Sequence, residues 1–105
     1  MISQAKTETD GTLVATVLVN ALDRSNAAEF REFAAPLAAA ATGRAVVDCT
    51  QIEFIDSSGL GALIYVQKQL PEGLQPLRLT GVGPRMLTVL ELLQVHRLFD
   101  IEPRN

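Results

Sequence analysis

Apolar residues change their spacing several times along this chain, and each change predicts a secondary-structure element. Residues 12–19 (TLVATVLV) are β-branched and aliphatic with partial alternation, and residues 2–9 alternate more weakly. Two such strands joined by a short Asp-Gly sequence are typical of a β-hairpin. We therefore expect a hairpin that turns at Asp10-Gly11.

The spacing becomes helical over residues 25–41. The large apolar residues that recur there at intervals of three or four positions are Phe30, Phe33 and Leu37. This spacing places them on one face of an α-helix. Ser25 or Asn26 is the candidate N-cap, because either side chain can accept a backbone hydrogen bond. Pro36 should kink or break the helix, since proline has no N–H to donate.

Short strands and helices then alternate. Strands are predicted over 44–50 and 77–80, and helices over 56–70 and 84–93, the last of which opens with a proline at its first position. Residues 96–101 (HRLFDI) suit either a strand or a helical turn, and their pattern leaves both open. The order β-β-α-β-α-β-α predicts an α/β layer fold. A length of 105 residues predicts a single domain, residues 1–105.

Composition and charge narrow the class of protein. Apolar residues make up 48% of the chain and charged residues 20%, as in ordinary globular domains. A net charge of -3 lacks the clustered cations that nucleic-acid binding requires, so no direct nucleic-acid partner is expected. With neither a signal sequence nor a stretch long enough for a membrane span, the chain is expected to be cytoplasmic.

Little in the sequence favours a metal, a cofactor or catalysis. The single cysteine, Cys49, lies in a predicted buried strand and has no second thiol for a disulfide or a zinc site. His96 is the only histidine, no G-x-S-x-G sequence is present, and no glycine-rich run completes a nucleotide-binding motif. We therefore expect neither cofactor nor metal, and a protein that is not an enzyme.

The stretch 54–64 (FIDSSGLGALI) holds the candidate chemistry. Asp56 is the predicted N-cap of the helix that follows, where its carboxylate can accept a hydrogen bond from the N–H of Ser58 or Gly59. At about 100° per residue, Ser58 falls roughly 160° from the middle of the apolar face, so its hydroxyl should point outward. Ser57 falls nearer the border of that face, and its hydroxyl should make local hydrogen bonds.

The residues that share the face of Ser58 are small or uncharged, and they are Gly61, Ala62 and Tyr65. A flat uncharged face suits docking to another protein. Periodicity alone favours a simpler interpretation, in which DSSG merely caps a helix, because such caps are common.

The run 46–64 (VVDCTQIEFIDSSGLGALI) resembles the signature of the STAS domain of bacterial anti-sigma factor antagonists. Residues 18–23 (LVNALD) and 89–101 (VLELLQVHRLFDI) resemble further parts of that domain. The resemblance implies a four- or five-stranded mixed sheet with its helices packed mainly on one face and the first strand at an edge. It also implies that HRLFDI ends in a strand.

In function, the resemblance implies a phosphorylation site at Ser58. The unphosphorylated protein would bind an anti-sigma factor that is also a serine kinase and so release the sigma factor. Phosphorylation of Ser58 would break that complex and a serine phosphatase would restore it. The resemblance also places Asp23 near the phosphorylation site, with a turn carboxylate as the alternative role. The expected partner-binding residues are Asp23, Asp56, Ser57, Ser58, Gly59, Gly61, Ala62 and Tyr65.

Several alternatives stay open at this point. The chain is expected to be a monomer or a weak dimer. STAS domains also serve as subunits of lipid-transporting ATPase complexes and as modules of stress-signalling scaffolds, so the fold alone does not decide the function. Two positions depart from the family pattern. Asn20 replaces a glycine before the Leu-Asp pair, which is a mild change. Gln94 replaces a glycine that commonly ends the third helix, so the helix should run on or the turn should be strained.

Overall fold

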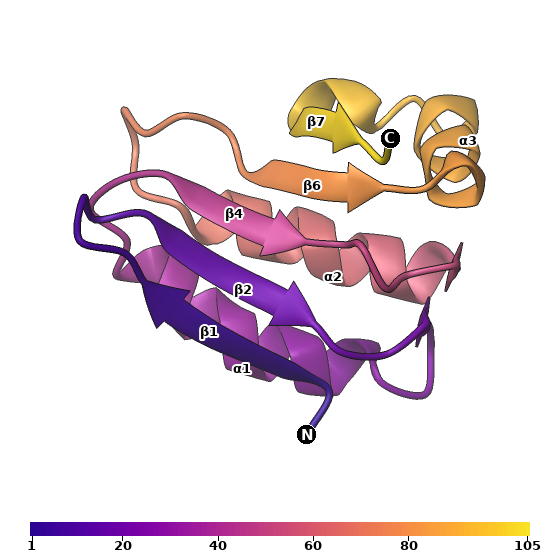
Figure 1. Ribbon diagram of the computed structural model, residues 1–105, viewed down its shortest axis with the longest axis horizontal. Helices are drawn as coiled ribbons and strands as arrows, with labels where there is room; N and C mark the ends of the chain where they lie inside the picture. Colours follow the sequence, from indigo (N-terminus) through magenta and orange to yellow (C-terminus); the bar gives the residue numbers. More distant parts are fainter.

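The computed structural model describes residues 1–105 and contains a five-stranded sheet with strand order β1-β2-β4-β6-β7 (Figure 1). Strand β1 pairs antiparallel with β2, and the other neighbours in the sheet are parallel. The strands are β1 (Ser3–Thr7), β2 (Leu13–Val17), β4 (Ala45–Asp48), β6 (Arg78–Val82) and β7 (Asp100–Pro103). The expected mixed sheet with its first strand at an edge is confirmed.

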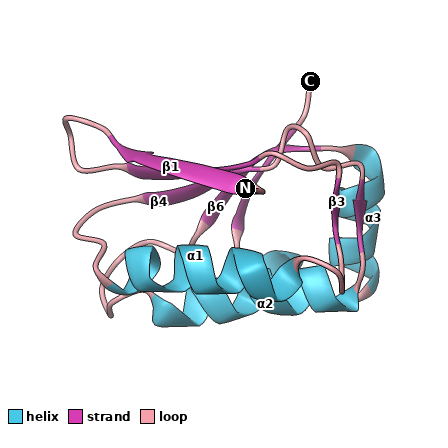
Figure 2. Cartoon of the chain, turned by 90° about the horizontal axis from the view of Figure 1, so that it is seen from below, coloured by secondary structure: helices cyan, strands magenta, loops and turns pink.

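Two helices, α1 (Ala27–Ala39) and α2 (Ser57–Gln69), lie side by side against one face of this sheet (Figure 2). Helix α3 (Pro84–Leu92) stands at one end of the sheet instead. The strands alternate, so that Val17, Val47 and Leu79 point into the layer between sheet and helices and are fully buried. Phe30 and Leu63 meet them from α1 and α2. The prediction of helices mainly on one face is therefore confirmed.

The hairpin is confirmed at the predicted turn, where Gly11 has a φ of 91°. Helix α1 also forms as predicted, and Asn26 occupies its N-cap position, but the Asn26 side chain makes no capping hydrogen bond. Of the kink or break predicted at Pro36, the break does not occur, because the helix continues to Ala39. Pro36 lies near the helix end, and the carbonyl that it leaves without a donor belongs to exposed Glu32, where water can replace the lost N–H.

The structure of the C-terminal segment answers two questions that the sequence left open, the conformation of HRLFDI and the helix end at Gln94. Residues His96–Leu98 form a short 3-10 helix, η1, and Asp100–Pro103 then form β7, so HRLFDI contains a turn and ends in a strand. Helix α3 stops at Leu92, and Gln94 has a φ of 57°. The N–H of Val95 bonds to the carbonyl of Leu90 at 3.0 Å, which is the pattern of a glycine-type helix end. The strained turn expected at Gln94 is confirmed.

One element was not predicted at all. Strands β3 (Ala21–Leu22) and β5 (Phe54–Ile55) form a separate two-stranded parallel sheet at the end of the molecule that α3 occupies. The carbonyl of Asn20 accepts hydrogen bonds from the N–H groups of Glu53 and Phe54, at 2.7 and 3.1 Å. Asn20 does not adopt a positive φ, so its replacement of glycine causes no strain. This small sheet brings two distant segments together.

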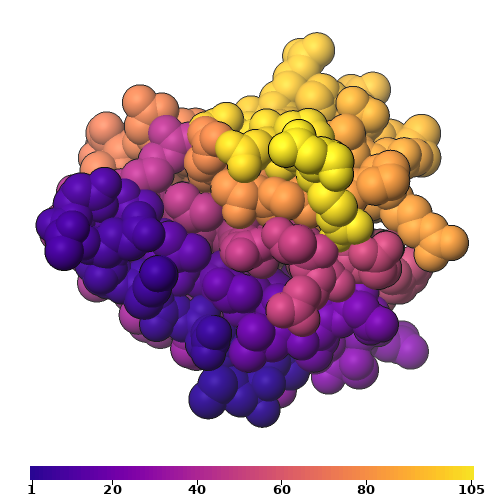
Figure 3. Space-filling view, viewed as in Figure 1, coloured from indigo at the N-terminus to yellow at the C-terminus, as the bar shows by residue number.

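The C-terminus fastens the segment that leads into β5. Figure 3 shows the last residues, in yellow, lying against the pink segment that follows β4. Arg104 donates hydrogen bonds to the Glu53 carboxylate at 2.9 Å and to the carbonyl of Ile52 at 3.2 Å, and a further one to the carbonyl of Thr50. The approach to β5 is thus held by Asn20 before β3 and by Arg104 near the C-terminus.

Candidate functional site

The start of α2 lies directly against β3. An ideal Cβ built on Gly59 would come 2.1 Å from the carbonyl oxygen of Leu22, so only glycine fits without movement of the backbone. Leu22 is in turn fully buried in the core. This close approach places the loop after β3, residues 23–26, beside the first turn of α2.

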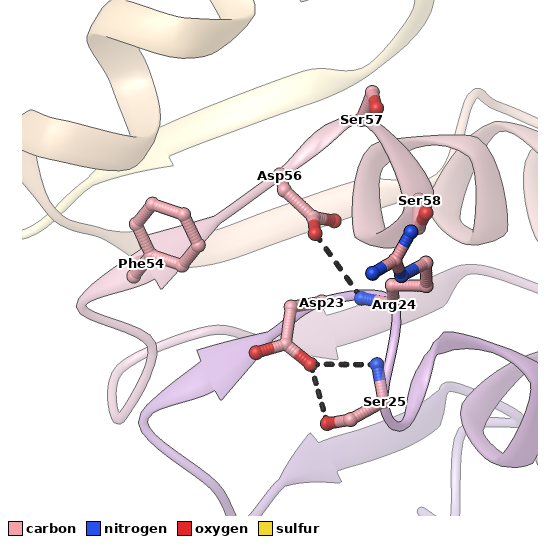
Figure 4. Close-up of a pocket in the computed structure, with 7 residues that line it drawn as sticks. All are labelled: Asp23, Arg24, Ser25, Phe54, Asp56, Ser57 and Ser58. Carbon is pink, nitrogen blue, oxygen red and sulfur yellow. Dashed lines mark hydrogen bonds between the residues drawn. The ribbon is translucent and has the colours of Figure 1, made fainter.

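Asp56 joins these two segments through its carboxylate, as Figure 4 shows. One oxygen accepts the Gly59 N–H at 2.9 Å and caps α2, as predicted. The other accepts the backbone N–H of Arg24 at 3.1 Å. The hydrogen bond from Gly59 is the main cause that lowers the pKa of Asp56, and the N–H groups of Arg24 and Ser58 and the Arg24 charge act in the same direction. Asp56 is therefore a charged cap for the helix and a link to the neighbouring loop.

Asp23 organises that loop. One of its carboxylate oxygens accepts hydrogen bonds from the Ser25 N–H at 2.9 Å and the Ser25 hydroxyl at 2.6 Å. Its own N–H donates to the side-chain oxygen of Asn26 at 3.0 Å. This is the role of a turn carboxylate, which was one of the two roles considered for Asp23. Its second oxygen is left without a hydrogen bond and is available to a partner.

These segments enclose an open hollow of about 430 Å³, here called the front hollow. It is lined by Asp23, Arg24, Ser25, Phe54, Asp56, Ser57 and Ser58 (Figure 4). Sequence reasoning missed Arg24, Ser25 and Phe54. Phe54 is 50% exposed at the edge of the hollow, whereas its neighbour Ile55 is buried. No local signal marks Phe54 as outward-facing, because strand β5 has only two residues and shows no alternation.

A second hollow, the helix groove, lies between α1 and α2. Its lining residues are Arg24, Ala27, Ala28, Arg31, Ser58, Gly61, Ala62 and Tyr65. Ser58 and Arg24 line both hollows, and Figure 4 shows the Arg24 side chain extending toward Ser58. Ser58 therefore stands at the junction of the two hollows, whereas Ser57 borders only the front hollow.

The predicted order of exposure for the two serines is wrong. Ser57 is exposed, while Ser58 is half-buried. The helical angle was measured from the apolar face alone, but α1 packs along the side of α2 that carries Ser58 and covers part of it. The local hydrogen bonds expected for the Ser57 hydroxyl are also absent. The Asp56 carboxylate beside it bonds to the N–H groups of Arg24 and Gly59 instead. Both hydroxyls are free to react or to bind.

The remaining predicted partner-binding residues are partly exposed and partly buried. Gly61 and Tyr65 are exposed, and Tyr65 presents 44% of its surface. Ala62 is buried at the floor of the helix groove, and Gly59 lines neither hollow. The uncharged face that the sequence predicted is therefore the wall of a groove, since the neighbouring α1 completes it.

The site contains no histidine. His96 lies at the far end of α3 with Glu91, Gln94 and Arg97. The two carboxylates of the front hollow already accept backbone hydrogen bonds, and no group of three or more potential metal ligands gathers in the structure. The buried thiol of Cys49 has a pKa raised to about 12 by desolvation, which makes it unreactive as a nucleophile. None of the helices is both long and apolar enough to cross a membrane.

Comparison with known protein families shows which family has this fold and this sequence around the two hollows. The family model described as Mlab, STAS domain matches residues 6–100. The chain belongs to the STAS domain family. No curated protein matches the sequence. The resemblance seen around the DSSG sequence therefore extends over nearly the whole chain.

Solved structures with the same fold include two named as anti-sigma factor antagonists. The STAS domain protein from Planctomyces limnophilus is 16% identical, with a TM-score of 0.86 over 98% of this chain and 91% of that one. The antagonist from Mycobacterium paratuberculosis is 21% identical, with a TM-score of 0.83 over 96% and 84%. The phosphorylated form of the Bacillus cell fate determinant SpoIIAA is 20% identical, with a TM-score of 0.66 over 94% and 89%. At these identities the likeness establishes the fold of this STAS domain.

Proposed function

We propose that this STAS domain is an anti-sigma factor antagonist switched by phosphorylation of Ser58. In its unphosphorylated form it binds an anti-sigma factor that is also a serine kinase, and the sigma factor is released. The kinase then phosphorylates Ser58 and the complex separates, until a serine phosphatase removes the phosphate. The chain acts as a regulator and a substrate, and it catalyses no reaction itself.

One observation carries the proposal: Ser58 has a free hydroxyl at the point where the front hollow meets the helix groove. A partner seated over either hollow would contact this residue. The structures of the same fold that are named as anti-sigma factor antagonists support an anti-sigma factor as the partner. The structure of phosphorylated SpoIIAA supports phosphorylation of a protein with this fold.

The position also explains why modification would act on the partner more than on the fold. Ser58 lies in the first turn of α2, where the helix dipole favours negative charge. A phosphate there leaves the core untouched. In a desolvated interface, however, an unpaired charge costs about 2–5 kcal/mol, which weakens binding from tens to thousands of fold.

The test is a calorimetric titration of the domain into its cognate kinase, identified as a serine kinase encoded beside this gene. Ser58→Ala should bind as tightly as the wild type, and Ser58→Asp should bind at least about thirtyfold more weakly. Thr88→Asp is the control, because it adds the same charge at an exposed position of α3 outside both hollows. Equal affinity for wild type and Ser58→Asp would contradict the proposal.

Mass spectrometry of phosphopeptides separates the two serines directly. After incubation with kinase and ATP, the phosphate should be found on Ser58. Its appearance on Ser57 alone would contradict the assignment, and the greater exposure of Ser57 makes this a demanding test.

A second candidate function rests on the family description, which names Mlab and not an anti-sigma factor antagonist. It is the role of a small subunit in a lipid-transporting ATPase complex. In that case the domain should co-elute with an ATPase encoded beside its gene, and Ser58→Asp should leave the sigma-dependent transcription of the host unchanged.

A further inference from the structure

The face of α1 and α2 that points away from the sheet carries a long groove. No other element of the chain covers the two helices on that side (Figure 2). The helix groove is continued by a hollow lined by Arg31, Glu32, Ala35, Pro36 and Tyr65. Arg31 and Tyr65 line both hollows, so the two are parts of one channel, here called the extended groove.

Two rows of side chains form its walls, and each recurs at the three- and four-residue intervals of one helix face. On α1 the row is Ala28, Arg31 and Ala35, and on α2 it is Ser58, Gly61 and Tyr65. An ideal Cβ on Gly61 would meet no atom within 4 Å. Small side chains therefore leave room along the groove for the side chains of another helix.

The walls carry positive charge although the chain as a whole carries a net charge of -3. Arg24 and Arg31 are exposed, and neither takes part in an ion pair, since the ion pairs of the structure are made by Arg44, Arg78 and Arg104. The Arg31 guanidinium lies 5.2 Å from the centroid of the Tyr65 ring. This cation–π contact holds the Arg31 charge over the middle of the groove.

Carboxylates lie only near the two ends of the extended groove. Asp56, close to its mouth, is near enough to Arg24 for the guanidinium charge to lower the Asp56 pKa. Glu32 borders the far end. The helix groove itself has two cations and no carboxylate in its lining. A complementary partner would therefore bring negative charge to Arg31 in particular.

We propose that the extended groove docks an acidic amphipathic helix of the partner protein. Its apolar side chains would face the alanine and glycine rows, and its carboxylates would face Arg31 and Arg24. On α1 the lining residues run from Ala27 to Pro36, so at 1.5 Å per residue a partner helix would follow the groove for about 15 Å. The identity of this partner as the anti-sigma kinase rests on the function proposed above.

This surface also connects Ser58 to the rest of the contact. Ser58 stands at the mouth of the groove with Arg24 on the opposite wall. A phosphate there adds a charge of about -1.5 to -2. It would compete for Arg24 and repel the carboxylates of an acidic helix. One modification could thereby release a partner that contacts the whole length of the groove.

The test uses a pair of synthetic helical peptides with the same leucine stripe, one with glutamates on its other faces and one with lysines. Each is titrated into the isotope-labelled domain, and amide shifts are followed by NMR. The acidic peptide should shift the amides of Ala28, Arg31, Gly61 and Tyr65, and the basic peptide should not. Arg31→Glu should weaken the acidic peptide by roughly tenfold or more, because attraction is replaced by repulsion. Arg85→Glu, the same change at an exposed position of α3, is the matched control.

Equal binding of the two peptides, or equal affinity in Arg31→Glu and Arg85→Glu, would overturn the proposal. So would shifts centred on the exposed leucines of the α3 end, Leu92, Leu93 and Leu98, which form a competing apolar surface. The kinase titration separates this inference from the proposed function. If Ser58→Asp weakens kinase binding and Arg31→Glu does not, the groove assignment fails and the switch stands. If the acidic peptide binds in the groove and Ser58→Asp leaves kinase binding unchanged, the switch fails and the docking groove stands.

Discussion

Gly59 and Gly61 lie two residues apart in α2, and replacing each by alanine should have opposite effects. A Cβ at Gly59 would come 2.1 Å from the Leu22 carbonyl oxygen, whereas real Cβ contacts shorter than 3.0 Å are essentially never found. The start of α2 or strand β3 must therefore move by about 1 Å, a small-to-large change that costs about 1–3 kcal/mol. A Cβ at Gly61 meets no atom, so Gly61→Ala should stabilise the helix by about 0.5–1 kcal/mol.

Chemical denaturation followed by circular dichroism measures both variants. Since alanine raises helix propensity at each position, their difference isolates the contact with Leu22. Gly59→Ala should be the less stable of the two by about 1.5–4 kcal/mol, and each kcal/mol corresponds to a melting temperature lower by about 4–8 °C. If the two variants gain equal stability, β3 does not hold the helix start in the way described here.

Three further predictions follow from single residues. Gln94→Gly should raise the free energy of unfolding by up to about 1 kcal/mol in the same denaturation assay, because glycine relieves the left-handed backbone; an unchanged or lower stability would refute the strain. Because the folded state lowers the pKa of Asp56 below its ordinary value of 3.8, its charge stabilises the fold at neutral pH, and that contribution is lost as pH falls below about 4 and through the folded pKa. Wild type should thus lose more stability than Asp56→Asn between pH 5 and strong acid, and parallel curves would contradict this. Cys49 should resist a thiol-specific reagent in the native state and react only on unfolding, since it is fully buried with a pKa of about 12; rapid labelling of the native domain would be inconsistent with its position.

The long elements could be predicted because their signals are local. The hairpin at Asp10-Gly11, the cap at Asp56 and the proline at the start of α3 each depend on backbone preferences of a few neighbouring residues. The departure at Gln94 was recognised from the family resemblance, which left open a longer helix or a strained turn, and the structure has the strained turn.

The small sheet of β3 and β5 escaped prediction for the opposite reason. Each strand has only two residues, too few for a period to be recognised, and the strands form because Asn20 and Leu22 meet Glu53 to Asp56 across the molecule. The front hollow depends on this pairing. Its unpredicted residues, Arg24 and Phe54, became part of a site only when the two segments were brought together.

The two serines show most clearly what the sequence determines and what tertiary packing determines. The sequence by itself determined that both lie in the first turn of a helix capped by Asp56, because helix starts depend on local hydrogen bonding. Which serine is more exposed was decided by tertiary packing, since the surface of a helix depends on every element beside it. Helix α1 covers one flank of α2, so Ser58 becomes half-buried at the mouth of a groove while Ser57 faces solvent. The positive walls of that groove arise in the same way, from Arg31 of α1 held over the Tyr65 ring of α2 and from Arg24 of the loop before α1.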